Sequence, residues 1–282
     1  MTADDLGLAS GINRGIMDCV EKGIVSSVSL CVNGRAAEEA LDFCKNHPRL
    51  DTGLHLVLAG EKALSRASGE NGLSGKSGDF FRNWATFLAA YFSRRIDQRG
   101  LEKEIEAQFK KLSGAGIRVI HVNSHQHLHI LPGILNIVMA NCRKYGVRFI
   151  RLPYSRPARH WLFADWHRVI LQIAVNLLCA LNANKIRAAG LRTCDNTTGV
   201  LYSGRMGSTA LRRFVSSLKI GKSEIIFHPG RVDEELLFLY GHWGYSWEEE
   251  TNLLCSCDIR KLLDEEMISL MSFSSRREYD GR

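Results

Sequence analysis

Short apolar runs alternate with amphipathic helical segments along most of the chain, and this order restricts the fold more than any other feature. Residues 24–32, 52–58 and 223–229 have the length and composition of buried strands. Segments such as 35–46 and 131–145 carry apolar residues at helical spacing. Because strand and helix follow each other repeatedly, we predict a mostly parallel sheet, open or closed into a barrel.

The same patterns predict the remaining elements. A helix begins near Ser10, whose side chain is expected to cap it, and Gly60–Gly78 is a loop. Further strands are expected at 118–125, 148–153 and 197–204, with a last one at 267–273, and further helices at 80–92 and 101–112. A chain of 282 residues fits one such domain, 1–282, which includes a helical insertion at 155–190.

Polar residues occupy every second position of "HVNSHQHLHI", as in a strand with one polar face. These residues are His121, Asn123, His125, His127 and His129. At about 3.3 Å per residue, the first and last of them would lie about 26 Å apart, whereas a metal binds nitrogen at about 2.0 to 2.1 Å. One ion cannot bind them all. We expect one to be a ligand and the others to line the pocket or support the ligands.

Three predicted strands bring histidines toward one edge of the sheet. His55 lies in the strand 52–58, His125 follows the strand 118–125, and His228 ends the strand before Pro229. Asp4 and Asp5 stand where a first strand would finish. Functional residues of parallel α/β folds gather at the carboxyl ends of the strands. A carboxylate and two imidazoles would leave open positions on a metal that activates water, and the second aspartate would act as general base.

Composition restricts partners and compartment. The formal net charge of +7 and the pI near 9.0 favour an anionic partner, but the basic residues are scattered and form no nucleic-acid-binding motif. The eight cysteines form no CxxC pair, no signal peptide is apparent, and no apolar run approaches the about 18 to 20 residues of a membrane span. We therefore expect a cytoplasmic protein that binds no nucleic acid.

Several motifs resemble one known family in order along the chain. "ADDLGLASGINRGI", "SSVSLCVNG", "TGLHLVL" and "HVNSHQHLHILP" are similar to motifs of the YdjC/ChbG-like carbohydrate deacetylases. The resemblance covers about residues 2 to 273. It implies a distorted (β/α) barrel like that of polysaccharide deacetylases, and an enzyme that removes acetyl groups from N-acetylated sugars.

Further segments resemble the branch of this family that is associated with hopanoid biosynthesis and called HpnK. These segments are "YGVRFIRLP", "RAAGLRTCDNTTGVLYSGRM" and "EIIFHPG". The substrate implied for that branch is N-acetylglucosaminyl bacteriohopanetetrol. Relatives that act on chitooligosaccharides have Asp where Asn123 stands, which also favours the hopanoid branch.

The matching motifs imply residue roles. Asp5, His55 and His125 resemble the ligands of one divalent metal ion, Mg²⁺ or Zn²⁺. Asp4 resembles the catalytic base, and His228 an acid near the leaving amine. We further expect His127, His129 and Arg151 to contact the substrate. The reaction implied is metal-assisted amide hydrolysis.

Two features lie outside this pattern. Only three residues precede Asp4, so the first strand is expected to be truncated and prone to fray, with poor metal binding as the consequence. From Trp161 to Leu181 the insertion has apolar residues at helical spacing, flanked by arginines and a lysine. This helix is expected either to pack on the barrel or to serve as an amphipathic lid or peripheral membrane contact.

Two other classes of function remain open on the sequence. A metal-dependent phosphoesterase uses a similar set of Asp and His residues, although two-ion sites need more carboxylates. A sugar- or lipid-binding protein on a decayed barrel is the alternative without catalysis. The number of subunits is not predicted.

Overall fold

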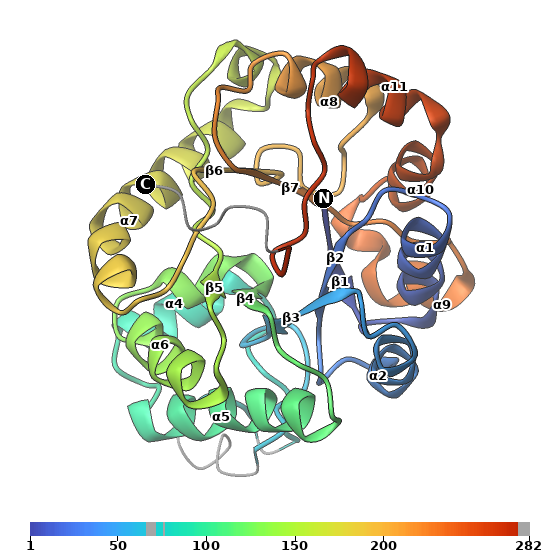
Figure 1. The fold of residues 1–282 in the computed structure, drawn as a ribbon. Coiled ribbons are helices and arrows are strands. Elements are labelled where there is room, and N and C mark those ends of the chain that lie inside the picture. The colour runs from blue at the N-terminus through green and yellow to red at the C-terminus, as the bar shows by residue number, and fades with distance from the viewer. Residues whose placement is uncertain (66–71, 76, 276–282) are drawn as a thin grey trace.

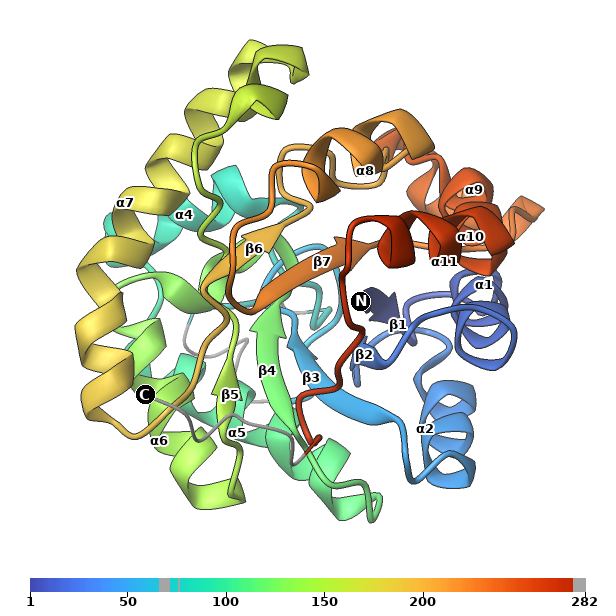
Figure 2. The ribbon, with the colours of Figure 1, turned by 45° about the horizontal axis from the view of Figure 1, so that its top comes forward.

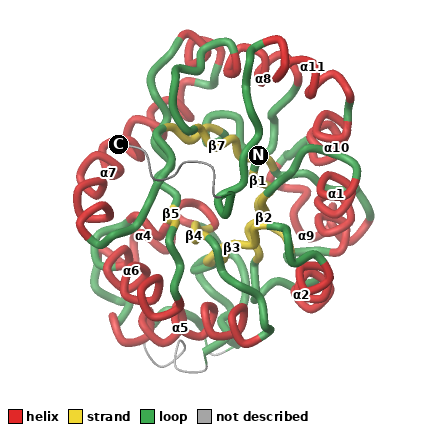
Figure 3. The backbone as a smooth tube through the Cα atoms, in the orientation of Figure 1, coloured by secondary structure: helices red, strands yellow, loops and turns green. Residues whose placement is uncertain are grey.

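The computed structural model describes residues 1–65, 72–75 and 77–275. Seven parallel strands form one curled sheet in the order β5-β4-β3-β2-β1-β7-β6. Helices surround this sheet, as Figures 1 and 3 show from the end of the barrel. The strands are β1 (Thr2–Leu6), β2 (Ser27–Leu30), β3 (Asp51–Leu56), β4 (His121–Ser124), β5 (Phe149–Ile150), β6 (Asn196–Thr198) and β7 (Ser223–Phe227).

The helices follow the strands in the alternation that the sequence predicts. They are α1 (Ser10–Glu21), α2 (Ala37–Asn46), α4 (Trp84–Phe92), α5 (Gln98–Gly114), α6 (Ile134–Tyr145), α7 (Trp166–Ala188), α8 (Ser208–Val215), α9 (Glu234–Tyr240), α10 (Trp247–Cys255) and α11 (Cys257–Glu265). Short 3₁₀ segments lie at His125–Ile130, Arg159–Phe163 and Gly241–Trp243.

The barrel closes only partly between its edge strands β5 and β6. Phe149 forms an isolated bridge with Arg192, whose carbonyl accepts from the backbone N–H of Ile150 over 3.0 Å. The backbone N–H of Thr197 donates to the carbonyl of Tyr154 over 2.8 Å. Figure 2 shows these edges approaching side by side. The predicted distorted (β/α) barrel is therefore confirmed.

The expectation of a truncated, fraying first strand is wrong. β1 is a central strand: Thr2 pairs with Ser27 of β2 on one side and with Ile226 of β7 on the other. All residues from Thr2 to Leu6 are buried. Three residues before Asp4 suffice because both neighbouring strands hydrogen-bond to this short segment.

Some other predicted elements differ from the structure. Residues 267–273 form no strand; instead they cross the barrel end, and the Phe273 ring packs 4.7 Å from that of His121. Helix α1 begins at Ser10 without a side-chain cap. The sequence patterns also missed the C-terminal helices α8, α9, α10 and α11, which are short, so few turns display their periodicity.

Helix α7 is longer than the predicted helical stretch. Among the described residues it alone has the length and composition of a membrane-spanning helix, with mean hydropathy 1.5 over an 18-residue window that is 28% buried. The expectation concerned unbroken apolar runs, and polar residues such as Gln172 and Asn176 do interrupt this helix, although its average hydropathy is high. The helix runs along the periphery of the barrel (Figure 2).

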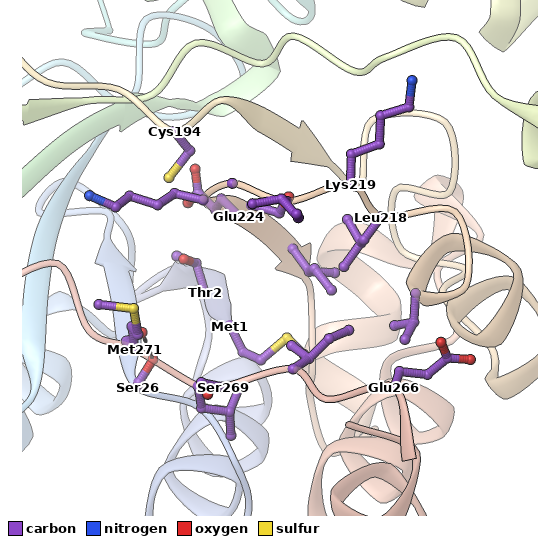
Figure 4. A pocket seen from close by; sticks show the side chains of 18 of the residues that line it. Met1, Thr2, Ser26, Cys194, Leu218, Lys219, Glu224, Glu266, Ser269 and Met271 are labelled. Atoms are coloured by element: carbon purple, nitrogen blue, oxygen red, sulfur yellow. Dashed lines mark hydrogen bonds between the residues drawn. The ribbon is translucent and has the colours of Figure 1, made fainter. Parts of the chain in front are cut away.

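A cavity of about 550 Å³ opens at the amino ends of the strands (Figure 4). Thr2, Ser27 and Glu224, which lie at the starts of β1, β2 and β7, contribute to its lining. Since the candidate ligands follow the opposite ends of the strands, this cavity is separate from the site described next.

Candidate metal centre

A bulge at the end of β1 turns two neighbouring aspartates toward the same interior. Successive strand residues normally point to opposite faces. Here the pairing of β1 with β2 shifts between Ala3 and Leu6, and Asp5 has a positive φ of 72°. Both carboxylates are buried, and both approach His55: Asp4 Oδ2 lies 3.8 Å from Nδ1 and Asp5 Oδ1 lies 3.2 Å from Nε2. A left-handed conformation in a residue other than glycine costs free energy, and such strain is common at functional sites.

The carboxylate of Asp5 lies between two imidazoles. Its Oδ1 is 3.2 Å from Nε2 of His55 and 3.2 Å from Nδ1 of His125. Burial opposes ionisation of Asp5, but the two histidines prevail and hold its pKa well below the usual value. The structure thus brings together all three residues that the sequence marked as metal ligands.

Asn123 fixes the tautomer of His55. Its Nδ2 donates to Asp4 Oδ1 over 3.1 Å and to Ser29 Oγ over 2.9 Å. The amide oxygen therefore faces His55 Nδ1, at 2.9 Å, and must accept a hydrogen bond from its N–H group. In a neutral ring this leaves Nε2 as a bare lone pair, directed at the Asp5 carboxylate.

This arrangement fits a bound cation. A lone pair that faces a carboxylate oxygen is unfavourable unless a proton or a metal ion lies between them. The other carboxylate oxygen, Asp5 Oδ2, is buried without a hydrogen-bond partner among the described residues. An oxygen donor and two nitrogen donors, one of them held by an outer hydrogen bond, form a donor set typical of divalent metals.

Cys31 also approaches this cluster, and the sequence analysis missed it. Within the described part of the chain, ligand atoms of Asp5, Cys31 and His55 all lie within 4.8 Å of one another. His125 is outside that most compact set, although it contacts Asp5. Burial raises the pKa of the Cys31 thiol well above its usual value, which keeps it protonated while no metal is bound. Its position directly after β2 is the signal that could have identified it.

The guanidinium of Arg151 is hydrogen-bonded to Asp4 and Glu224. Its Nη1 donates to Asp4 Oδ2 and its Nη2 to Asp4 Oδ1, the second bond over 3.0 Å. Nε and Nη2 also donate to Glu224 Oε1, at 3.1 and 2.7 Å. Arg151 as a whole is 3% exposed. The structure therefore does not support Arg151 as a direct substrate contact, because its donors are engaged by two buried carboxylates. Glu224 gave no sequence signal, since it lies within a strand.

Asp4 is held as a carboxylate. Burial alone would raise its pKa, but the charges of Arg151 and His55 and the hydrogen bonds from Arg151 outweigh burial and keep the pKa below the usual value. The low pKa makes Asp4 a weak base in this state, and Glu224 competes with it for the same guanidinium.

The predicted histidine-rich strand ends at Ser124. Gln126 and His127 both have left-handed backbones, with φ of 57° and 56°, and so the chain turns sharply after β4. This turn directs His125 to Asp5, while the buried ring of His129 bonds Ser124 Oγ at 2.6 Å and a backbone carbonyl at 2.8 Å. The alternation of polar residues thus extends past Ser124, although the strand that it predicted ends there.

Two histidines of this turn were expected to contact substrate. Both ring nitrogens of His129 are hydrogen-bonded to protein groups, so the structure does not support a direct contact by this residue. His127 differs, because its buried Nδ1 lacks a partner among the described residues. Burial keeps the pKa of both histidines below the usual value, so both rings are neutral near pH 7.

His228 follows β7 and is held in a neutral tautomer. The backbone N–H of Gly204 donates to its Nδ1 over 3.3 Å, which places the ring proton on Nε2. Burial lowers the pKa of His228 below the usual value. Glu250 supports both chain segments, since its carboxylate accepts from the backbone N–H groups of His228 and Met206, at 2.5 and 2.8 Å.

Aromatic rings line one side of the cluster. Trp243 lies 5.2 Å from His125, centroid to centroid, at an interplanar angle of 32°. Tyr245 lies 5.3 Å from Trp243 and 5.1 Å from His228. Because the C–H face of a pyranose ring packs well on aromatic surfaces, half-exposed rings beside a metal centre suit a sugar substrate. The sequence analysis did not identify this group.

Comparison with known proteins gives the family. The model of the YdjC-like protein family matches residues 1–265. The chain belongs to the YdjC-like family. A carbohydrate deacetylase of Thermoanaerobacter pseudethanolicus is 28% identical over 274 residues, which cover 97% of each chain. A human carbohydrate deacetylase is 32% identical over 242 residues, which cover 82% of this chain and 74% of the human one.

A solved structure supports the fold of this YdjC-like chain. The crystal structure of an Enterococcus faecalis protein, provisionally named for cellobiose-phosphate cleavage, superposes with a TM-score of 0.72. The superposition covers 96% of this chain and 95% of the other, at 20% sequence identity. At that identity the likeness extends to the fold, and activity has to be argued from the site itself.

Proposed function

We propose that this YdjC-like protein is a carbohydrate deacetylase that hydrolyses the N-acetyl group of an N-acetylglucosamine conjugate with the help of one divalent metal ion. The observation that carries the proposal is the meeting of His55 and His125 at Asp5 Oδ1, each at 3.2 Å. The named activity of the relatives from Thermoanaerobacter and human supports it.

Asp5, His55 and His125 would hold the ion, with Cys31 close enough to join when the ion is soft, such as Zn²⁺. A divalent ion at this position supplies Lewis-acid polarisation of the acetyl carbonyl. Asn123 keeps the His55 ring oriented for binding through its amide oxygen.

The remaining steps belong to protein groups. Asp4 stays ionised and takes a proton from the attacking water, while Arg151 positions its carboxylate. His228 donates a hydrogen bond from Nε2 to the departing nitrogen, and the proton that Asp4 took from water passes to that nitrogen as the C–N bond breaks. As long as Gly204 donates to its Nδ1, His228 acts as a neutral donor, so its role is closer to hydrogen-bond stabilisation than to transfer of an imidazolium proton.

The substrate we favour is N-acetylglucosaminyl bacteriohopanetetrol. The segments similar to the hopanoid branch and the presence of Asn123 support this choice. The aromatic wall of Trp243 and Tyr245 would receive the sugar ring, and His127 Nδ1 offers a buried polar contact. Deacetylation would leave the glucosaminyl lipid and acetate.

The alternatives of the sequence analysis have less support. In the described ranges the compact ligand cluster contains one carboxylate, whereas two-ion phosphoesterases require more. A truncated first strand would favour a binding protein on a decayed barrel, but β1 is paired on both sides and buried.

Acetate release tests the proposal. The purified protein, loaded with Mg²⁺ or Zn²⁺, should release acetate from N-acetylchitobiose or from the N-acetylglucosaminyl lipid, and Asp5→Ala should abolish the release. Phosphate release from phosphosugars would favour the phosphoesterase instead. Tight sugar binding without any product in the presence of each metal would favour the binding protein.

A further inference from the structure

Helix α7 exposes a row of large apolar side chains on its outer side. Trp166, Ile170, Ile173, Leu177 and Leu181 recur every three or four residues, so they form one stripe along the helix. They are 75%, 58%, 48%, 63% and 78% exposed. At about 1.5 Å per residue this outer stripe is about 22 Å long, and its exposed area is on the order of 500 Å², near the upper end of what monomers expose.

The opposite side of α7 packs on the barrel and buries two amide side chains among the apolar residues Val175, Cys179 and Ile186. Gln172 Nε2 donates to the carbonyl of Pro153 over 3.0 Å, and Asn182 Nδ2 donates to the carbonyl of Ile130 over 2.9 Å. Both amides are buried, together with Cys179 between them. These contacts occur at separated turns, so the helix lies flat against the barrel along its length (Figure 2). It is therefore poorly suited to crossing a bilayer alone.

The surroundings of the outer stripe are basic. Residues 154–192 contain six arginines and lysines but a single acidic residue, Asp165. Lys185 and Arg187 are exposed at one end of α7. At the other end the guanidinium of Arg213 lies 3.8 Å above the ring of the exposed Phe163. Positive charge thus lies at both ends of the apolar stripe.

We propose that the outer stripe of α7 docks on an anionic lipid bilayer and lies in its interface. An apolar helix face with basic residues beside it and a tryptophan on it matches the chemistry of that interface. A second copy of the chain fits less well, because a symmetric pairing of two α7 helices would bring basic residues together, and residues 154–192 offer them Asp165 alone as an acidic partner. The inference does not depend on the proposed deacetylase activity.

Vesicle co-sedimentation tests this docking. The wild-type protein is mixed with vesicles of phosphatidylcholine alone and of phosphatidylcholine with phosphatidylglycerol. We expect binding to the anionic vesicles, weakened by 0.5 M salt. The double substitution Ile173→Glu and Leu177→Glu should lower the partition coefficient by about tenfold or more. As a matched control, Leu237→Glu with Phe238→Glu changes two exposed apolar residues of α9 and should have no effect.

Folding and mass measurements separate the outcomes. The far-UV circular dichroism spectrum and the thermal unfolding midpoint of the α7 variant should match those of the wild type, which shows that the variant is folded. If the wild type stays in the supernatant with anionic vesicles, or if the α7 and α9 variants bind equally, the docking is disproved. Light scattering that shows a dimer dissociated by the α7 substitutions, without vesicle binding, would assign the stripe to self-association instead.

Discussion

Asn123 and His55 are joined by a hydrogen bond of 2.9 Å whose direction is set by a third group. Because the Asn123 amide nitrogen faces the Asp4 carboxylate, its oxygen must face His55 Nδ1. The ring is thereby prepared to offer Nε2 to a cation beside Asp5. Asn123, which is not among the proposed metal ligands, therefore determines whether His55 can bind the metal.

The first prediction concerns this hydrogen bond. Asn123→Leu removes the acceptor for His55 Nδ1, so metal affinity should fall by about 10-fold to 100-fold. Asn123→Asp keeps an acceptor and should bind metal much more tightly than the leucine variant. Isothermal titration of metal into both proteins measures the difference. Equal affinities in the two variants would contradict the role given to Asn123.

The second prediction separates Asp4 from Asp5. Asp4→Asn keeps the shape but removes the proton acceptor, so acetate release should fall by about 10² or more while one metal ion still binds per chain. Asp5→Asn should reduce metal binding itself. Metal content by atomic spectroscopy, measured on the samples used for kinetics, distinguishes the two. An Asp4→Asn enzyme of normal rate would refute Asp4 as base.

The third prediction concerns Arg151, which is buried between Asp4 and Glu224. Arg151→Met leaves two buried carboxylates without a cation, so the free energy of unfolding should fall by about 3 to 5 kcal/mol. Adding Glu224→Gln to this variant removes one of those charges and should restore part of the loss. Urea denaturation of the single and double variants measures this. If the second substitution adds to the damage, the pairing argued here is incorrect.

The fourth prediction is acid lability from buried histidines. Burial lowers the pKa of His121 from 6.5 to about 4. Between these values the unfolded chain binds more protons than the folded one, so stability is complete above pH 6.5 and is lost as the pH falls toward 4. The cost is about 3 kcal/mol for His121 alone. Glu250, whose pKa burial raises to about 7, acts in the opposite direction between pH 4.5 and 7.

Substitution of His121 isolates its share. His121→Phe keeps an aromatic ring beside Gly53 and Phe273 but cannot gain a proton. Its unfolding free energy, measured with a chelator present, should depend less steeply on pH between 6.5 and 4.5, by up to one proton. His242→Gln, which changes an exposed ring, should leave the slope unchanged. A His121→Phe slope identical to that of the wild type would show that His121 does not contribute.

Alternation of strand and helix predicted a mostly parallel sheet, because burial on both faces gives parallel strands continuous apolar runs such as Ile225 to Phe227. Closure into a distorted barrel was implied only by the resemblance to the deacetylase family. The first strand was misjudged, since three residues before Asp4 look insufficient on the sequence, whereas pairing on both sides stabilises them. That stabilisation is tertiary, and a local pattern cannot show it.

The candidate site was predictable where residues lie at or directly after the carboxyl ends of strands, as His55 and His125 do. The residues that support this site were harder to predict from the sequence. Arg151 looked like a substrate contact until Asp4 and Glu224 were seen to take up its donors. Trp243 approaches the cluster from a distant segment without any motif of its own, whereas Cys31 lies in the motif SSVSLCVNG, directly after β2, and was not singled out. The bulge at Asp5, which places both aspartates in one interior, depends on strand register.

Anomalous X-ray diffraction from crystals soaked in Zn²⁺ or Mn²⁺ tests the central claim most directly, because it places the ion independently of activity. We predict a single strong anomalous peak within about 2.0 to 2.3 Å of donor atoms from Asp5, His55 and His125. A fully soaked crystal without a peak between these three side chains, or with its ion bound elsewhere, would contradict the account.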